Sequence, residues 1–275
     1  MELKGEEQSL ARLTRAVDAA YGCGFAAVSA NDHLIFQTPW LDGPTALAAV
    51  LERTGDMELA TTISLVSLRG PVQLAKTLAA LDVLSDGRVV AGVGPGSSQR
   101  DYDAVGIPFE ERWRRFEAAT AELRTLLGAG SPLEPAPRRP GGIPIWIGSW
   151  GSDAGMRRVA RLGDGWLASA YNTTPERFNA GREQLPDGFP NAVVTMWTWI
   201  TEDARDADRV LRDVLAPLLG RDPQALRAQV CVGPAAHCAE LIARYGEAGC
   251  ERVYFWPLDD EATQVELLSG LAPQS

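Results

Sequence analysis

The chain has 275 residues, of which 45% are hydrophobic and 23% are charged, a composition typical of a globular protein whose core needs no staples. Its formal net charge of −10 excludes nucleic acid and anionic lipid as expected partners, because an acidic surface repels both. Four cysteines without a C-x-x-C pair, and only two histidines, predict no metal site and favour reduced thiols in a cytoplasmic protein. Residues 1–9 are polar, and neither they nor any later apolar run predict a signal peptide or a membrane span.

Helix and strand patterns alternate along the chain. Helical spacing of apolar residues predicts helices over residues 9–21, 45–53, 71–84, 108–127, 153–161, 175–184, 206–219, 234–248 and 262–271. Short apolar or β-branched runs predict strands over residues 25–29, 59–67, 88–93, 143–147, 165–169, 192–200 and 252–256. This alternation with short links is typical of βαβ units and a parallel sheet.

Two architectures fit this order of elements, a doubly wound open sheet and a closed barrel. The seven expected strands are one fewer than a (β/α)8 barrel needs. The missing strand would precede the first helix, but residues 1–7 show no apolar alternation. The pattern alone therefore leaves both architectures open.

A glycine-rich turn, Gly92–Gly96, follows one expected strand. Glycines there let the backbone approach a ligand closely, although a plain turn explains them equally well. The dinucleotide-binding pattern G-x-G-x-x-G is excluded, because it needs glycine where Ser97 stands.

A second turn, Ile147–Asp153, joins a strand to the amino end of a helix. Such a junction readily binds a phosphate group, and Arg157 and Arg158 lie one turn further on. The alternative interpretation is an ordinary capped helix, with Ser152 or Asp153 as its N-cap.

Asp32 and His33 stand together directly after a strand. A histidine beside a carboxylate at the carboxyl end of a strand suits proton transfer near neutral pH. This position favours a catalytic role over a structural one. His237 lies within a helix that looks peripheral and is expected at the surface.

Tryptophans recur at the ends of the expected strands or in the loops after them, at Trp40, Trp150, Trp197, Trp199 and Trp256. Each one could be a core residue, but several together would line an apolar pocket of the kind that planar ligands use. Trp197 and Trp199 share one face of a strand, because side chains repeat every two residues.

Several stretches resemble the luciferase-like monooxygenase superfamily, which includes FMN-dependent monooxygenases and deazaflavin-dependent oxidoreductases. The stretches that carry the resemblance are residues 24–33, 74–76, 81–88, 92–96, 143–148 and 160–166. The likeness runs from about residue 10 to residue 270. It implies one α/β domain over residues 1–275, a (β/α)8 TIM barrel of the luciferase-like type that lacks or replaces its first strand.

The resemblance also implies a cofactor, coenzyme F420 or FMN, at the carboxyl ends of the strands. Its phosphate would lie near Gly148, Ser149 and Trp150. The turn with Gly94, Gly96 and Ser97 would flank its chain or ring system. A non-proline cis peptide at about Thr62–Ile63 would back the ring, and His33 with Asp32 would supply the ionisable pair.

Three departures from the family pattern follow. The family's first strand is absent from the expected elements. Either the start of the chain has been mis-assigned, or the barrel closes without that strand. The loop 128–142 is short. Members of the family often carry a longer insertion at this position, which covers the active site. Ser97 stands where some deazaflavin members carry a glutamate, which leaves the general acid open.

The favoured hypothesis is hydride transfer between coenzyme F420 and a small organic substrate, in a pocket lined by Trp40, Trp197, Trp199 and Trp256. The short loop favours it over an FMN-dependent two-component monooxygenase that uses reduced flavin and O2 and needs a flavin reductase. A non-catalytic barrel that binds flavin or an apolar ligand is a third possibility. The open sheet edge also predicts a homo-oligomer, a dimer.

Overall fold

The computed structural model describes residues 9–271, and these fall into two units that we describe separately. Among the described residues, the β1–β5 unit comprises residues 26–149 and 157–167, and the β6–β8 unit comprises residues 9–25, 150–156 and 168–271. The expectation about residues 1–7 lies outside the described part of the chain. The single-domain assignment stays a prediction.

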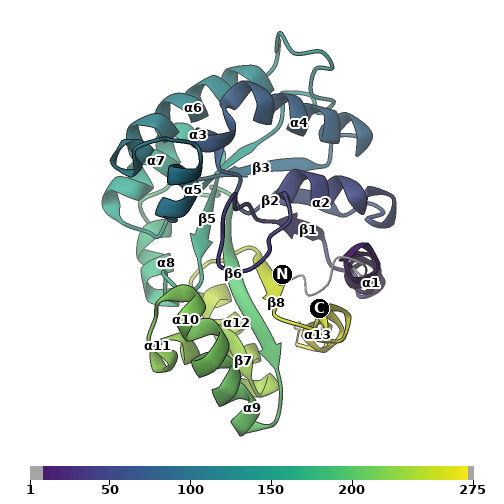
Figure 1. The fold of residues 1–275 in the computed structure, drawn as a ribbon, viewed down its shortest axis with the longest axis vertical. Helices are drawn as coiled ribbons and strands as arrows, with labels where there is room; N and C mark the ends of the chain where they lie inside the picture. The colour runs from purple at the N-terminus through teal and green to yellow at the C-terminus, as the bar shows by residue number, and fades with distance from the viewer. Residues whose placement is uncertain (1–8, 272–275) are drawn as a thin grey trace. The chain divides into compact units, whose positions relative to one another are not determined.

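Consecutive parallel strands form the sheet of the β1–β5 unit, and helices connect them. The strands are β1 (Ala27–Ala30), β2 (Glu58–Thr61), β3 (Val89–Val93), β4 (Ile145–Gly148) and β5 (Gly165–Ser169). The helices are α2 (Gly43–Ala49), α3 (Val66–Arg69), α4 (Pro71–Leu84), α5 (Gln99–Ala104), α6 (Arg112–Leu127) and α7 (Asp153–Leu162). Each strand pairs in register with the next one along the chain. Helices α4 and α6 pack side by side (Figure 1).

The β6–β8 unit is built around one long strand, β6 (Asn191–Ile200), which pairs in parallel with β7 (Cys231–Gly233) and with β8 (Val253–Pro257). Its helices are α1 (Ser9–Gly22), α8 (Pro175–Arg182), α9 (Ala204–Arg209), α10 (Ala216–Leu219), α11 (Pro223–Arg227), α12 (Ala235–Glu247) and α13 (Glu261–Ser269), with a π-helical segment at Val210–Leu215. Helices α1 and α13 lie side by side in Figure 1, and Arg12 of α1 binds the carboxylate of Glu261.

All seven predicted strands are present, and β7 is an eighth that its length of three residues hid. The first element among residues 9–271 is helix α1, which begins at the first described residue. The strand predicted over residues 59–67 was too long, because the chain leaves the sheet after Thr61 and forms α3. The predicted long helix begins at Arg112, and α5 and α11 were missed.

The loop 128–142 is tied down at the amino ends of the strands. The buried carboxylate of Asp82 accepts hydrogen bonds from the backbone N–H groups of Arg138 (2.7 Å) and Arg139 (3.2 Å), and from that of Val89 at the start of β3 (3.3 Å). This loop leads into the amino end of β4, at the edge of the sheet opposite to the carboxyl ends. Its short length therefore says nothing about how open a site at the carboxyl ends is, and that part of the sequence argument was wrong.

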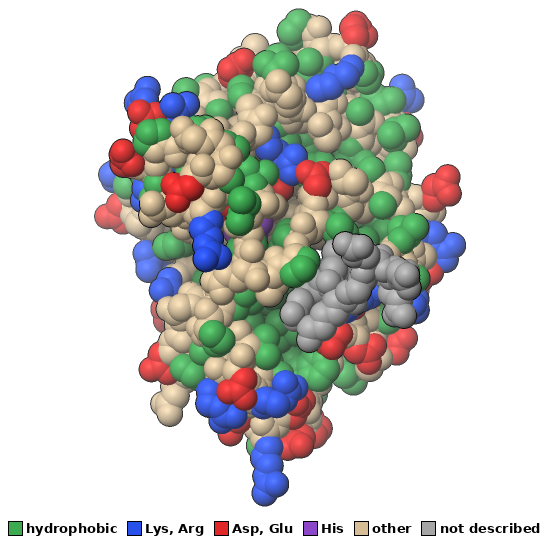
Figure 2. All heavy atoms as spheres, in the orientation of Figure 1, with side chains coloured by type: hydrophobic (Ala, Val, Ile, Leu, Met, Phe, Trp, Pro, Cys, Tyr) green, Lys and Arg blue, Asp and Glu red, His purple; other side chains and the backbone are tan. Residues whose placement is uncertain are grey.

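Charged patches, membrane-spanning helices and metal sites would each point to a second kind of site in the described residues. Acidic and basic side chains are interspersed over the face in Figure 2. Within residues 9–271, no helix is long and apolar enough to cross a membrane, and no cluster of three His, Cys, Asp or Glu side chains could hold a metal ion. The four cysteines are free, with Cys231 and Cys238 buried and Cys23 and Cys250 half-buried.

Close packing of strands β2 and β3 requires glycine at position 92. A Cβ atom there would lie 1.9 Å from the carbonyl oxygen of Thr61 and 2.6 Å from Cδ1 of Leu167. The first of these atoms is backbone and cannot move aside without breaking the ladder. Gly92 is therefore a packing requirement of the sheet.

We expect Gly92→Ala to lower the free energy of unfolding by about 1–3 kcal/mol or more, measured by urea denaturation. The matched control is Gly246→Ala in helix α12, where a Cβ meets nothing within 4 Å. That change should raise stability by roughly 0.5–1 kcal/mol, because alanine favours helix. A Gly92→Ala protein as stable as wild type would contradict the packing argument.

Candidate active site

The carboxyl ends of β1, β2, β3 and β4 bring four loops to one edge of the β1–β5 unit. Ala30 pairs with Thr61, and Val93 pairs with Ile147, so the residues that follow these strands start at neighbouring positions. Segments that contain polar residues or glycines follow all four strands. In α/β barrels this edge carries the active site.

The chain bulges out of the sheet directly after β2. The Thr62–Ile63 peptide bond is cis, which confirms the position expected from the sequence. The backbone returns at Ser64, which pairs with Val93 and donates its N–H to the carbonyl of Gly92 at 2.8 Å. The bulge thus places Ile63 at the edge formed by the carboxyl ends of the strands.

The half-buried side chain of Ile63 lies against two glycines that the sequence analysis assigned to the cofactor. A Cβ at Gly94 would lie 2.7 Å from Cδ1 of Ile63, and a Cβ at Gly148 would lie 3.2 Å from Cγ2. Gly96 has a φ of +76° and would bring a Cβ to 2.7 Å from Leu65. These glycines make room for the bulge, which is a structural reason for them beside any contact with a ligand.

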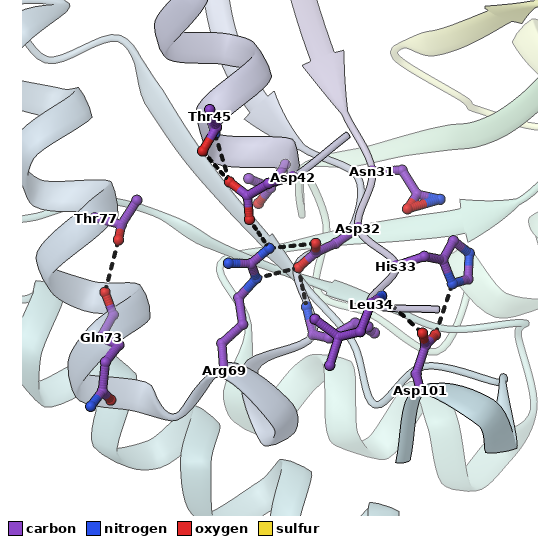
Figure 3. Close-up of polar contacts among 12 residues, drawn as sticks. Asn31, Asp32, His33, Leu34, Asp42, Thr45, Arg69, Gln73, Thr77 and Asp101 are labelled. Carbon is purple, nitrogen blue, oxygen red and sulfur yellow. Dashed lines mark hydrogen bonds and ion pairs between the residues drawn. The ribbon is translucent and has the colours of Figure 1, made fainter. Parts of the chain in front are cut away.

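A histidine from the loop after β1 and a carboxylate from helix α5 meet at this edge (Figure 3). Nδ1 of His33, after β1, lies 2.8 Å from Oδ2 of Asp101, in α5. The other oxygen of Asp101 accepts the backbone N–H groups of Leu34 and Ile35, each at 2.8 Å. The Asp101 side chain is 2% exposed and that of His33 is 16% exposed, so the pair is shielded while the imidazole still reaches the surface.

These contacts lower the pKa of Asp101. Burial raises it, but the hydrogen bond from His33 and those from the backbone of Ile35 and Leu34 outweigh burial. The carboxylate is therefore held ionised in the folded protein.

Two aromatic rings enclose the imidazole of His33. The ring of Phe36 stacks on it, with centroids 4.1 Å apart and planes 20° from parallel. The ring of Trp40, predicted to line the pocket, meets it edge-on at 5.5 Å. The imidazole is thus fixed by a carboxylate at one nitrogen and by rings on its sides.

Asp32 serves a different purpose from the one expected. Its buried carboxylate binds the guanidinium of Arg69, with Nη2 at 2.6 Å from Oδ1, and accepts the backbone N–H of Leu65 at 3.2 Å. Arg69 also binds Asp42, which caps helix α2 through the N–H of Thr45 (Figure 3). The interpretation of Asp32 and His33 as one pair was wrong, because neighbouring side chains in an extended segment point in opposite directions.

The two carboxylates that hold Arg69 raise the pKa of its guanidinium, with the hydrogen bond to Asp32 as the largest cause. Burial raises the pKa of Asp42, but its hydrogen bonds to Thr45 and Arg69 lower it further, so that the net shift is downward. This cluster joins the loop after β1 to helices α2 and α3, and it is a structural support of the loop that carries His33.

The remaining residues predicted to bind the cofactor, Ser97, Ser149 and Trp150, lie in different surroundings. Ser97 is exposed and precedes Ser98, whose hydroxyl caps α5. Ser149 donates its N–H to Leu167, and its carbonyl accepts the indole N–H of Trp166 at 3.0 Å. Trp150 is 47% exposed.

The junction before α7 matches the simpler alternative. Ser152 accepts the backbone N–H of Gly155 at its hydroxyl and that of Met156 at its carbonyl, so it acts as the N-cap of the helix.

The other predicted pocket residues belong to the β6–β8 unit. Trp197 and Trp256 meet edge to face, with centroids 5.1 Å apart. Trp199 instead donates its indole N–H to Asp206 of α9 at 2.6 Å. His237, predicted at the surface, is half-buried in α12, and its Nε2 lies 3.3 Å from the carbonyl of Val230.

Sequence reasoning missed Asp101, Arg69, Asp42 and Phe36. Asp101 had a usable signal, because Ser98-x-x-Asp101 has the spacing of a helix-starting capping box and so predicts the short helix α5. No signal in the sequence pointed to Arg69, since an arginine before Gly70 and Pro71 is unremarkable in itself. Its partners come from loops that only the fold brings together.

Residues at this edge fit a flat heteroaromatic cofactor. Among the described residues, the buried atoms Oγ1 of Thr62, Oγ of Ser64 and Oδ1 of Asn31 have no hydrogen-bond partner. Buried polar groups are ordinarily paired, so a ligand with polar edges would explain these exceptions. Ile63 beside them offers an apolar surface to a ring.

Comparisons with known proteins agree with this architecture. A sequence model of the luciferase-like monooxygenases matches residues 1–218. An uncharacterized protein of Mycobacterium tuberculosis is 27% identical over 267 residues, covering 90% of this chain and 80% of that protein.

Two solved structures share the fold. An F420-dependent secondary alcohol dehydrogenase in complex with an F420–acetone adduct has a TM-score of 0.81 at 19% identity, over 99% of this chain and 96% of its own. The monooxygenase RslO1 from Streptomyces bottropensis has a TM-score of 0.81 at 20% identity, over 97% and 93%. These similarities confirm the α/β barrel and exclude the doubly wound sheet.

We expect Arg69→Met to lower the free energy of unfolding by about 3–5 kcal/mol, because it leaves the buried carboxylate of Asp32 without its partner. Adding Asp32→Asn should recover part of that loss. The control is Arg138→Met, whose partner Asp86 has a side chain 84% exposed, and its loss should be within about 1 kcal/mol. Urea denaturation measures both free energies of unfolding. Equal losses in the two arginine variants would show that the ion pair between Arg69 and Asp32 does not stabilise the fold.

The lowered pKa of Asp101 predicts a pH dependence. An ionised carboxylate that is favoured in the folded state stabilises the protein above its unfolded pKa of about 3.9, and this stabilisation is lost as the pH falls through the folded-state pKa. The stability gap between wild type and Asp101→Asn should therefore be full above about pH 4 and shrink below it. Urea denaturation from pH 7 to pH 3 measures the gap, and a gap that stays constant refutes the assignment.

Proposed function

Because the chain belongs to the luciferase-like monooxygenase family, we propose that it is an oxidoreductase that transfers a hydride between coenzyme F420 and a small organic substrate. The observation that carries this proposal is the His33–Asp101 pair, held between aromatic rings at the carboxyl ends of the strands. Hydride transfer to or from a carbonyl carbon needs such a group, because a proton must move as well.

Residues at the carboxyl ends of the strands would bind the cofactor. The bulge at Thr62–Ile63 would support the cofactor ring, with the unpaired atoms of Thr62, Ser64 and Asn31 available to its polar edges. Gly148 and Ser149 would approach its phosphate, as the resemblance implies. A bound deazaflavin supplies a ring carbon that accepts or donates a hydride.

His33 would handle the proton. When an alcohol carbon gives up a hydride, its hydroxyl proton leaves too, and the imidazole accepts it as the carbonyl forms. In the reverse direction the imidazolium returns the proton to the carbonyl oxygen. Asp32 has no part in this chemistry in our proposal, because its oxygens are occupied by Arg69 and Leu65.

Apolar side chains after His33 favour a substrate with a hydrocarbon body. Leu34, Ile35 and Leu41 are 39%, 51% and 37% exposed. Exposed apolar groups beside a candidate catalytic group gain free energy when a ligand covers them. We therefore expect ketones or secondary alcohols with short alkyl chains rather than sugars or phosphates.

Other expectations remain predictions. The alternative function, an FMN-dependent monooxygenase, would need a flavin reductase as partner. The titration below tests this alternative. A homodimer remains expected, and light scattering of the purified protein decides it.

The first test is a fluorescence titration of the protein with F420 and, separately, with FMN. We expect tight binding of F420. Tight binding of FMN alone would replace the proposal with a two-component monooxygenase, and binding of neither would support a non-catalytic barrel.

His33→Ala then tests the role of the imidazole. With F420 and a series of secondary alcohols, it should lower turnover by about 10²–10⁴-fold, the usual contribution of a general base, and leave the Kd for F420 unchanged. His237→Ala is the matched control and should retain full turnover. Turnover that survives His33→Ala removes His33 from the mechanism.

A further inference from the structure

We infer that Asp101 is a positioning residue that fixes His33 in the tautomer with hydrogen on Nδ1, so that Nε2 is the nitrogen that exchanges a proton with the substrate. The tautomer follows from the contacts themselves. Its consequence for turnover rests on the function proposed above.

An ionised carboxylate only accepts hydrogen bonds, so the group that faces it must be a donor. Oδ2 of Asp101 lies 2.8 Å from Nδ1 of His33, and therefore Nδ1 carries the hydrogen. In a neutral imidazole the other nitrogen, Nε2, is then an acceptor. Within the described part of the chain Nε2 has no hydrogen-bond partner, and the side chain is 16% exposed.

Two ring contacts and two hydrogen bonds to the carboxylate keep the imidazole in this orientation. Phe36 stacks on one of its faces at 4.1 Å, and Trp40 meets it edge-on at 5.5 Å. The backbone N–H groups of Leu34 and Ile35 hold Oδ1 of Asp101, so the carboxylate itself cannot rotate away from the histidine. Asp101 thus fixes both the loop that carries His33 and the nitrogen that it presents.

Asparagine at position 101 separates these two roles. Its amide oxygen can take the place of Oδ1 and accept the hydrogen bonds from Leu34 and Ile35, which retains the loop. Its NH2 group then faces Nδ1 of His33, and two donors cannot face each other. Asp101→Asn should therefore move the hydrogen from Nδ1 to Nε2 while the fold is kept.

The chain suits a direct measurement, because it has only two histidines. Long-range ¹H–¹⁵N correlation spectra of protein labelled with ¹⁵N-histidine report which ring nitrogen carries the hydrogen. His33→Gln assigns the signals, and His237 is the internal control. Spectra are taken at a pH high enough that both sets of signals no longer move with pH.

In wild type we expect His33 to carry its hydrogen on Nδ1, and in Asp101→Asn on Nε2, with His237 unchanged between the two proteins. A wild-type His33 with its hydrogen on Nε2 would overturn the inference. That spectrum decides the question even where Asp101→Asn does not fold.

The turnover arm uses the F420-loaded protein and a substrate from the series above. Asp101→Asn should lower kcat by about 10²–10⁴-fold with the Kd for F420 unchanged, because Nε2 no longer accepts a proton. Asp86→Asn, a change at an exposed carboxylate, should retain wild-type kcat. An inverted tautomer with unchanged kcat would show that Asp101 positions His33 but that His33 is not the proton acceptor, which overturns the proposed function and leaves the tautomer standing.

Discussion

Parallel pairing of β1 to β4 is the constraint from which the candidate site follows. Parallel strands must all return through a helix, so every carboxyl end emerges at the same edge. Four loops that are 30 or more residues apart in the sequence thereby become neighbours. The sheet also needs Gly92, because a Cβ there would clash with the carbonyl oxygen of Thr61 at the end of β2. Directly after Thr61 the chain bulges at the cis Thr62–Ile63 peptide.

Two buried carboxylates support the loop after β1, and their partners give them different roles. Asp32 faces Arg69, a permanent cation, and the result is a structural ion pair. Asp101 faces the imidazole of His33 instead, and the result is a hydrogen-bonded pair at the candidate site. A carboxylate thus holds the loop through an ion pair at one position and orients the imidazole of His33 at the other.

The stretches most typical of the family are partly structural. Residues 81–88 carry Asp82, which ties down the loop before β4 at the edge opposite to the site. The glycines at positions 94 and 148 accommodate Ile63. A strong resemblance therefore identifies the fold more directly than it identifies the reacting groups, and the chemistry has to be argued from His33 and its contacts.

The sequence by itself determined the alternation of elements, the α/β class and the bounds of most strands, because these depend on local periodicity and on short-range turn chemistry. It also located the cis peptide at Thr62–Ile63 and the position of His33 in the loop after a strand, since both segments follow recognisable strands. It missed β7, which has too few residues to show a period. It paired His33 with the wrong carboxylate, because the right one lies 68 residues further along the chain. Only the tertiary structure could make that choice, since a hydrogen bond between distant loops depends on how the strands between them pair and leaves no periodic trace in the sequence.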